Sequence, residues 1–198
     1  EVRGLAAEFQ RRHSRLDVLV NNAGAIMLGR RESVDGIEMT WALNHLSYFL
    51  LTNLLWDVLV SSAPARIVNV SSSSHQRAGI NFDDLQGQRR YGGFRAYAQS
   101  KLGNLLFTYE LARRLEGTGV TVNALHPGLV ATNLLANNGL AGHLLNFFLR
   151  RWGTNVEKGA QTVVYLAASP DVAGASGRYF VSQREISSSA ASYDMGAA

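Results

Sequence analysis

The sequence predicts an α/β fold built on an open parallel sheet. Short apolar runs alternate with longer segments that have the spacing of a helix face, and the apolar runs end in Asn, Ser, Gly or Pro. The segments between successive runs are long enough for a crossover helix, which parallel strands require. Of the 198 residues, 46% are hydrophobic and 17% are charged, which is typical of a globular domain with one core.

Four apolar runs predict the strands in chain order. Each run stops where a polar, Gly or Pro cluster begins: residues 17–20, 66–70, 120–125 and 177–181. We expect the first run to be buried on both faces, because parallel strands covered by helices are continuously apolar.

Five segments predict helices, because their apolar residues are three and four positions apart. They are residues 2–12, 36–62, 93–115, 144–151 and 155–168. Ser33 and Asp35 are candidate caps of the second helix. The polar, turn-rich stretch 74–91 is expected to be a loop.

Composition and charge exclude several classes of protein. With no cysteine, the chain has neither a disulfide scaffold nor a thiolate zinc site, and its histidines have no metal-ligand spacing. The formal charge is only +4 and the basic residues form scattered pairs, so we expect solvated faces rather than a nucleic-acid site. The longest apolar stretch, 46–60, is interrupted by Asn53 and Asp57 and is shorter than the roughly 20 residues of a membrane span. We expect a cytoplasmic protein without an integral span.

Polar clusters follow the first three predicted strands, where ligands bind in open parallel sheets. Asn21-Asn22-Ala23-Gly24 follows the first, and its glycine permits close backbone approach. Four serines, residues 71–74, follow the second and could donate hydrogen bonds to a substrate oxygen. His126-Pro127-Gly128 follows the third. Each cluster alone could also be an ordinary turn or a helix cap.

The helix predicted over 93–115 contains Tyr97 and Lys101, which share one face at a spacing of i, i+4. A phenol with a reference pKa near 10 is a poor base, and a nearby ammonium lowers that pKa. The pair could therefore act as a general acid and base. The alternative is a solvated lysine beside a half-buried tyrosine.

Taken together and in this order, the motifs resemble the short-chain dehydrogenase/reductase family. They are N-N-A-G at 21–24, a strand-end serine, Y-x-x-x-K at 97–101 and P-G-x-x-x-T at 127–132. The resemblance covers nearly the whole chain. Four stretches are most similar to the retinol dehydrogenase-like and WW-domain oxidoreductase-like branch: 43–55, 67–72, 83–85 and 176–180. The resemblance implies a doubly wound, Rossmann-type sheet in a single domain over residues 1–198.

The resemblance also implies a catalytic set. Tyr97 corresponds to the catalytic acid/base, and Lys101 to the lysine that binds the nicotinamide ribose and lowers the tyrosine pKa. Ser72 corresponds to the substrate-orienting serine, with the serines on either side of it left open. Asn44 corresponds to the asparagine that holds a water in the proton relay.

The cofactor implied by the resemblance is NADP or NAD, with NADP favoured. Its expected contacts are Asn22, Ala23, Gly24, Tyr97, Lys101, Pro127, Gly128 and Thr132. The implied reaction is hydride transfer between this cofactor and an apolar alcohol or carbonyl compound. The apolar side chains of about 129–153 are expected to form a substrate lid, or else to pack on the core. A sugar-nucleotide epimerase also uses Y-x-x-x-K, but the region after Gly128 leaves little room for its substrate domain.

One part of the family pattern does not occur among the 198 residues, namely the glycine-rich turn T-G-x-x-x-G-x-G that receives the pyrophosphate. We therefore expect a sheet that is incomplete at its N-terminal side, in a fragment of a longer enzyme. The alternatives are a truncated product and a shortened variant that pairs with another chain. A non-catalytic relative with a binding or scaffold role is the alternative function. The resemblance further implies a homodimer or homotetramer through the helices at 36–62 and 93–116.

Overall fold

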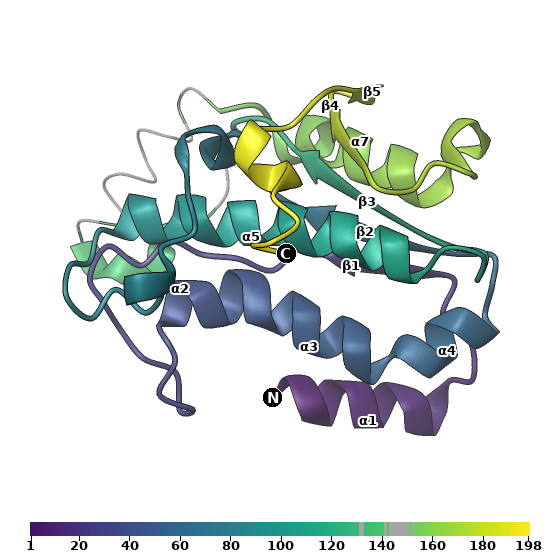
Figure 1. Cartoon of the computed structure of the whole chain (residues 1–198), viewed down its shortest axis with the longest axis horizontal. Helices are drawn as coiled ribbons and strands as arrows, with labels where there is room; N and C mark the ends of the chain where they lie inside the picture. Colours follow the sequence, from purple (N-terminus) through teal and green to yellow (C-terminus); the bar gives the residue numbers. More distant parts are fainter. Residues whose placement is uncertain (131–132, 141, 143–150, 152) are drawn as a thin grey trace.

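The computed structural model describes the chain except for residues 131–132, 141, 143–150 and 152 (Figure 1). At its centre is a five-stranded sheet with the order β1-β2-β3-β4-β5. The strands are β1 Val18–Asn21, β2 Ala65–Val70, β3 Val120–His126, β4 Arg178–Val181 and β5 Arg184–Glu185. The first four run parallel and β5 runs antiparallel to β4, so the expected parallel sheet is confirmed.

The first helix precedes β1, and the others follow between the strands along the chain. They are α1 Val2–Arg12, α2 Met39–Trp41, a π-helix Ala42–Leu46, α3 Ser47–Leu54, α4 Trp56–Ser61, α5 Gly93–Arg114 and α7 Val156–Ala168. Short 3₁₀ turns include η2 Ser73–Arg77, η3 Phe82–Asp84, η4 Ala136–Asn138 and η6 Ala190–Tyr193.

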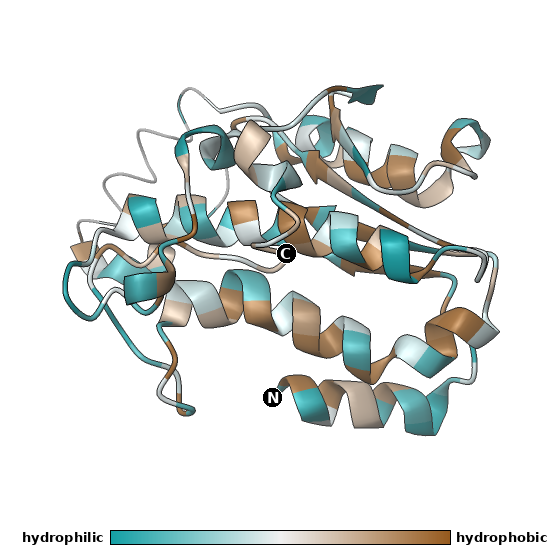
Figure 2. Cartoon of the chain, viewed as in Figure 1, coloured by the Kyte–Doolittle hydropathy of each residue, from teal (hydrophilic) through white to brown (hydrophobic). Residues whose placement is uncertain are grey.

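Helices cover both faces of the sheet (Figure 1). Ile67 packs with Leu111 and Val122 in the core beneath α1, α3, α4 and α5. The next residue of β2, Val68, packs with Leu166 of α7 on the opposite face, because successive side chains of a strand alternate. Hydrophilic and hydrophobic residues alternate along the helices (Figure 2). The doubly wound, Rossmann-type fold is thus confirmed.

The second helix differs from the expectation of one helix over 36–62. Its first turn is capped by Glu38, whose carboxylate accepts the backbone N–H of Thr40 and Trp41, so the expected caps Ser33 and Asp35 were wrong. Glu38 is buried and replaces the hydrogen bonds that the first helical N–H groups lack. A π-helix and a break at Leu55 divide the remainder into three helical pieces.

Three further expectations need correction or lie outside the described residues. Val20 is 39% exposed on the α7 side of the edge strand β1, so β1 is not buried on both faces. The stretch 74–91 contains η3 and most of η2 rather than loop alone. The helix expected over 144–151 lies outside the described residues except for Arg151.

Strand β5 was not expected from the sequence. It is joined to β4 by Ser182 and Gln183, which have φ angles of 49° and 63°. Positive φ at both central residues is the geometry of a type I′ hairpin turn, for which Asn-Gly is the usual sequence. Since neither residue is Asn or Gly, no usual turn sequence marks this hairpin.

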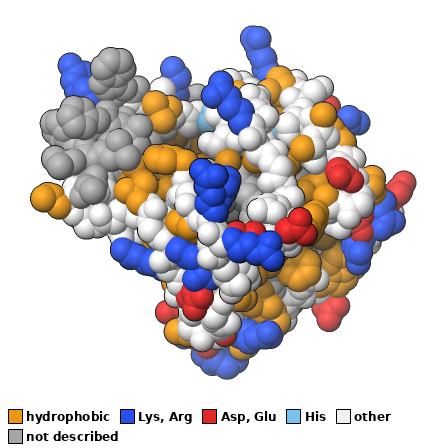
Figure 3. All heavy atoms as spheres, turned by 60° about the vertical axis from the view of Figure 1, so that its left-hand side comes forward, with side chains coloured by type: hydrophobic (Ala, Val, Ile, Leu, Met, Phe, Trp, Pro, Cys, Tyr) orange, Lys and Arg blue, Asp and Glu red, His pale blue; other side chains and the backbone are white. Residues whose placement is uncertain are grey.

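The described helices include none that is both long and apolar enough to cross a membrane. On the face drawn in Figure 3, Lys and Arg side chains are spread out, with Asp and Glu side chains among them. This distribution agrees with the expectation of ordinary solvated faces.

Candidate active site

A polar network joins the first two strands to the helices beneath their carboxyl ends. Asn21 Nδ2 donates to Asn69 Oδ1 (2.8 Å) and to Thr52 Oγ1 of α3 (3.1 Å). Asn69 Nδ2 in turn donates to Thr108 Oγ1 of α5 (2.9 Å). All four side chains are buried, so each bond satisfies a polar group that water cannot reach. The network holds the strand ends in a fixed position relative to α3 and α5.

Asn44 lies in the π-helix and is fully buried. Its Oδ1 accepts the backbone N–H of Ala25 (2.9 Å), and its Nδ2 donates to the carbonyl oxygen of Ala25 (2.9 Å) and to Ser100 Oγ (3.1 Å). The Asn44 carbonyl accepts a hydrogen bond from Asn104 Nδ2 of α5 (2.9 Å). π-Turns are rare and are frequent at functional sites. Here the turn places Asn44 between α5 and the loop after β1.

The turn after β1 lies directly against these groups. The Tyr48 hydroxyl donates to the carbonyl oxygen of Ala23 (2.9 Å) and holds the turn in place. A Cβ atom at Gly24 would lie 3.2 Å from Asn44 Oδ1 and 3.6 Å from Lys101 Nζ, so glycine permits this close approach. Asn22 and Ala23 are exposed and accessible to a ligand.

Tyr97 and Lys101 are adjacent on α5 and both are buried. Lys101 Nζ lies 5.7 Å from the centroid of the Tyr97 ring and 5.6 Å from that of Tyr48. It donates to the carbonyl oxygen of Val70 at the end of β2 (2.9 Å). The alternative of a solvated lysine therefore does not hold.

Burial dominates the protonation of this pair. It raises the pKa of Tyr97, while the hydroxyl of Ser72 acts in the opposite direction. It lowers the pKa of Lys101 to about 7, because an ammonium is poorly solvated there. Lys101 was expected to lower the pKa of Tyr97, but in this structure burial raises it. Tyr97 thus keeps its proton at neutral pH.

The three serines left open by the sequence occupy different environments. Ser71 Oγ donates its hydrogen bond to the carbonyl oxygen of Lys101 in α5 (2.8 Å). Ser73 is exposed. Ser72 Oγ accepts the backbone N–H of Ser74 (3.2 Å), and its hydroxyl is the one that acts on the pKa of Tyr97. Of the three, Ser72 best fits a substrate-orienting role.

The remaining expected contacts follow β3. Pro127 and Gly128 come directly after its last residue, and Gly128 has a φ of 86° that favours glycine. The Nδ1 atom of His126 is buried there without a hydrogen-bond partner among the described residues. Thr132 lies outside the described residues.

Several residues of the site were missed by sequence reasoning. Ser100, Asn104 and Thr108 are buried and hydrogen-bonded along α5. Their spacing of four residues was a usable signal, because it forms a polar stripe beside Tyr97 on a helix facing a core. Tyr48 bonds to Ala23 and His75 is bonded by Ser189, backbone groups far away in sequence, so no local pattern indicated these bonds.

The depressed pKa of Lys101 gives a testable pH dependence. Between about pH 7 and 10.5, Lys101 is protonated in the unfolded chain but largely neutral in the folded chain. The free energy of unfolding therefore rises with pH over this range, and the cost of burying Lys101 is largest at the low-pH end. Relative to wild type, Lys101→Met is expected to have a higher free energy of unfolding at neutral pH, and the difference should shrink as the pH rises. Urea unfolding over this range measures it, with exposed Lys158→Met as control. A difference that does not vary with pH would contradict the burial argument.

The comparisons agree with this geometry. The model of the short chain dehydrogenase family matches residues 1–141. Retinol dehydrogenase 14 of Mus musculus is 51% identical over 182 residues, covering 90% of this chain and 54% of that protein. This chain therefore spans about half the length of the curated relatives it matches.

Two solved structures are similar in fold as well. A crystal structure of an uncharacterised protein from Mycobacterium paratuberculosis has 31% identity and a TM-score of 0.73, covering 99% of this chain and 67% of the other. The Pseudomonas aeruginosa RhlG/NADP active-site complex has 28% identity and a TM-score of 0.62, covering 90% and 69%. With its family match over most of its length, the chain belongs to the short-chain dehydrogenase family and is retinol dehydrogenase-like within it.

Proposed function

We propose that the protein is an NAD(P)-dependent oxidoreductase that transfers a hydride between the nicotinamide and an apolar alcohol or carbonyl compound. The observation that carries the proposal is the buried Tyr97–Lys101 pair beside Ser72 at the carboxyl edge of the sheet. The similarity to retinol dehydrogenase 14 and to the RhlG/NADP complex supports it, and the latter favours NADP.

The described residues fit the nicotinamide half of such a cofactor. A side chain at Gly24 would crowd Asn44, so glycine at this turn suits close approach of a ligand to the backbone. The residues that would hold the cofactor are Asn22, Ala23, Gly24, Tyr97, Lys101, Pro127, Gly128 and Thr132. When bound, the nicotinamide supplies or accepts the hydride.

The chain itself supplies orientation and proton transfer. In reduction, Ser72 and Tyr97 hydrogen-bond the carbonyl oxygen, and Tyr97 gives its proton to the developing alkoxide. Lys101 would hold the ribose of a bound cofactor and, with Asn44, would connect Tyr97 to water. The raised pKa of Tyr97 agrees with the role of proton donor in this direction.

An apolar substrate is supported by the surroundings of Tyr97. Its ring packs with Ile26 and Leu135, and Leu28 and Leu134 lie against this cluster. Leu135 belongs to the segment of about 129–153 that we propose as the substrate lid. A polar chain of a ketone or aldehyde brought against this buried cluster would lose hydration that apolar side chains cannot replace.

The test uses the full-length protein with NADPH or NADH and matched aldehydes that differ only in whether the chain is apolar or hydroxylated. We expect oxidation of NADPH with the apolar aldehyde and a lower kcat/KM with the hydroxylated one. Dinucleotide binding without turnover of any aldehyde or alcohol would instead favour the non-catalytic, binding or scaffold function. Turnover with a preference for polar substrates would contradict the apolar lid.

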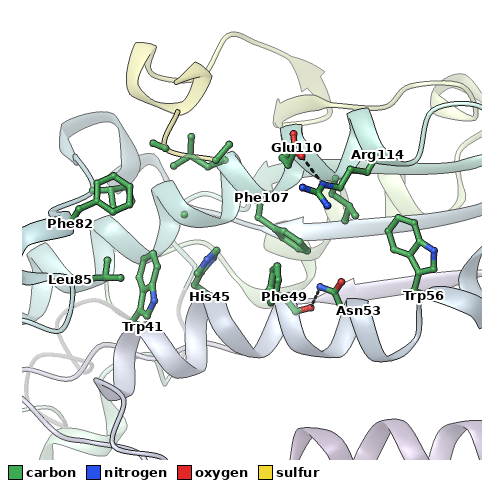
Figure 4. Close-up of a pocket in the computed structure, with 16 residues that line it drawn as sticks. Trp41, His45, Phe49, Asn53, Trp56, Phe82, Leu85, Phe107, Glu110 and Arg114 are labelled. Atoms are coloured by element: carbon green, nitrogen blue, oxygen red, sulfur yellow. Dashed lines mark hydrogen bonds and ion pairs between the residues drawn. The ribbon is translucent and has the colours of Figure 1, made fainter. Parts of the chain in front are cut away.

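We also propose a homodimer or homotetramer that associates through α3 and α5. A groove of about 600 Å³ runs between these helices (Figure 4). Trp41 and Phe49 face it from one side and Phe107 from the other, while Glu110 and Arg114 form an ion pair at its border (2.6 Å). An open groove lined by apolar and aromatic side chains, of which Phe49 is exposed, is typical of a protein–protein contact.

Light scattering after size-exclusion chromatography tests this assembly. Phe49 is 49% exposed in the groove, and Phe49→Arg is expected to convert the oligomer to a monomer, because a guanidinium would be buried in the contact. The matched control is Val34→Arg, at an exposed residue that does not line the groove. A monomeric wild-type protein would contradict the proposal.

A further inference from the structure

The imidazole of His75 is fully buried close to Ser72, yet no step of the proposed reaction uses it. It belongs to the 3₁₀ turn η2, which begins directly after Ser72. Its Nδ1 lies 2.5 Å from the carbonyl oxygen of Ser72, and its Nε2 accepts the backbone N–H of Ser189 (3.2 Å). The ring also packs edge-on against Tyr179, with 5.2 Å between the centroids.

These two partners define the state of the ring. A carbonyl oxygen can only accept and a backbone N–H can only donate, so both bonds are satisfied by a neutral imidazole with its proton on Nδ1. Burial favours the same neutral form by lowering the pKa of His75. The ring is therefore a fixed link between two main-chain groups that are more than a hundred residues apart in sequence.

The segment around Ser189, which bonds to Nε2 of His75, is itself hydrogen-bonded to α5. Ser188 Oγ lies 2.6 Å from both the Tyr109 hydroxyl and Ser192 Oγ, and the Tyr193 ring stacks on Tyr109 at 5.1 Å. Ser192 is buried and its hydroxyl donates to the carbonyl oxygen of Ser189 (2.6 Å). His75 thus links the turn at Ser72 to the segment around Ser189, and that segment is held against α5, the helix that carries Tyr97.

We infer that His75 is a positioning residue for Ser72. Its Nδ1–H holds the main chain of Ser72, so that the hydroxyl remains beside Tyr97 where a carbonyl oxygen would be bound. The inference rests on the proposed function, because it assigns a consequence for turnover to a residue that does not touch the substrate. A misplacement of the hydroxyl by about 1 Å is enough to reduce turnover about 100-fold.

Two substitutions separate the two hydrogen bonds. The amide of His75→Asn can replace Nδ1 as donor to Ser72, whereas that of His75→Gln can replace Nε2 as acceptor from Ser189. We expect the Gln variant of the full-length protein to lose about 10- to 100-fold in kcat and the Asn variant to stay within about threefold of wild type. The affinity for NADPH should be unchanged in both. His13→Gln, at an exposed histidine, is the control.

The outcomes distinguish the two proposals. Equal kcat in wild type and His75→Gln contradicts the positioning role only. Equal losses of kcat in both variants, accompanied by equal losses of thermal stability, also contradict it, because His75 would then be merely structural. Absence of turnover in the wild-type protein with every alcohol and carbonyl compound contradicts the proposed function and with it the role of His75.

Discussion

Tyr97→Phe in the full-length protein is expected to lose nearly all turnover and still bind NADPH. The substitution removes only the hydroxyl that donates the proton, and general acid catalysis contributes about 10²- to 10⁴-fold to a rate. Binding should survive, because the ring and Lys101 keep their places on α5. Steady-state kcat and the NADPH dissociation constant are the measurements.

The Phe variant should also fold normally. The Tyr97 ring already packs in an apolar cluster with Ile26 and Leu135, and burial opposes its ionisation. Its melting temperature is therefore expected to equal or exceed that of wild type. Tyr165→Phe, on α7 at the other face of the sheet, is the matched control and should leave kcat unchanged. Wild-type kcat in Tyr97→Phe would refute the assignment of the acid/base.

Asn44→Ala is expected to reduce both stability and turnover. The change removes three side-chain hydrogen bonds in a fully buried site and leaves the N–H and C=O of Ala25 without these partners. Each buried polar group left unsatisfied costs about 1–3 kcal/mol, so we expect a loss of roughly 2–6 kcal/mol in the free energy of unfolding. Turnover should fall as well, because the loop after β1 would no longer be held against Lys101.

Denaturant unfolding and kcat together test this prediction. The matched control is Asn137→Ala, since Asn137 is exposed in η4 and its change should alter stability by less than about 0.5 kcal/mol. A loss in Asn44→Ala no larger than that of the control would show that the hydrogen bonds around the π-helix do not hold the loop.

The first four strands and their parallel arrangement could be predicted from sequence because parallel strands covered by helices have a strong apolar signal. Residues 66–70 and 120–125 were expected as strands and are found in β2 and β3. Features that depend on side-chain hydrogen bonds were not predictable in this way. Glu38 caps α2 through its carboxylate, and the π-helix around Asn44 depends on contacts with α5 and the loop after β1.

The candidate site was predictable where several strand ends carry polar clusters at once. Ser72, Tyr97 and Lys101 are brought together as the motif order suggested. The sequence could not reveal that burial would dominate the protonation of Tyr97 and Lys101, because the burial of a helix face depends on its neighbours in space. For the same reason, His75 had no local signal, since its partner Ser189 lies far along the chain.

The most direct test of the central claim follows a labelled hydride. NADPH that carries deuterium at C4 of the nicotinamide would be incubated with the full-length protein and an apolar aldehyde, and the product alcohol analysed by mass spectrometry. We predict deuterium on the carbinol carbon with the wild-type protein and almost no product with Tyr97→Phe. An unlabelled alcohol, or no alcohol while NADPH and aldehyde are both bound, would contradict hydride transfer at this site.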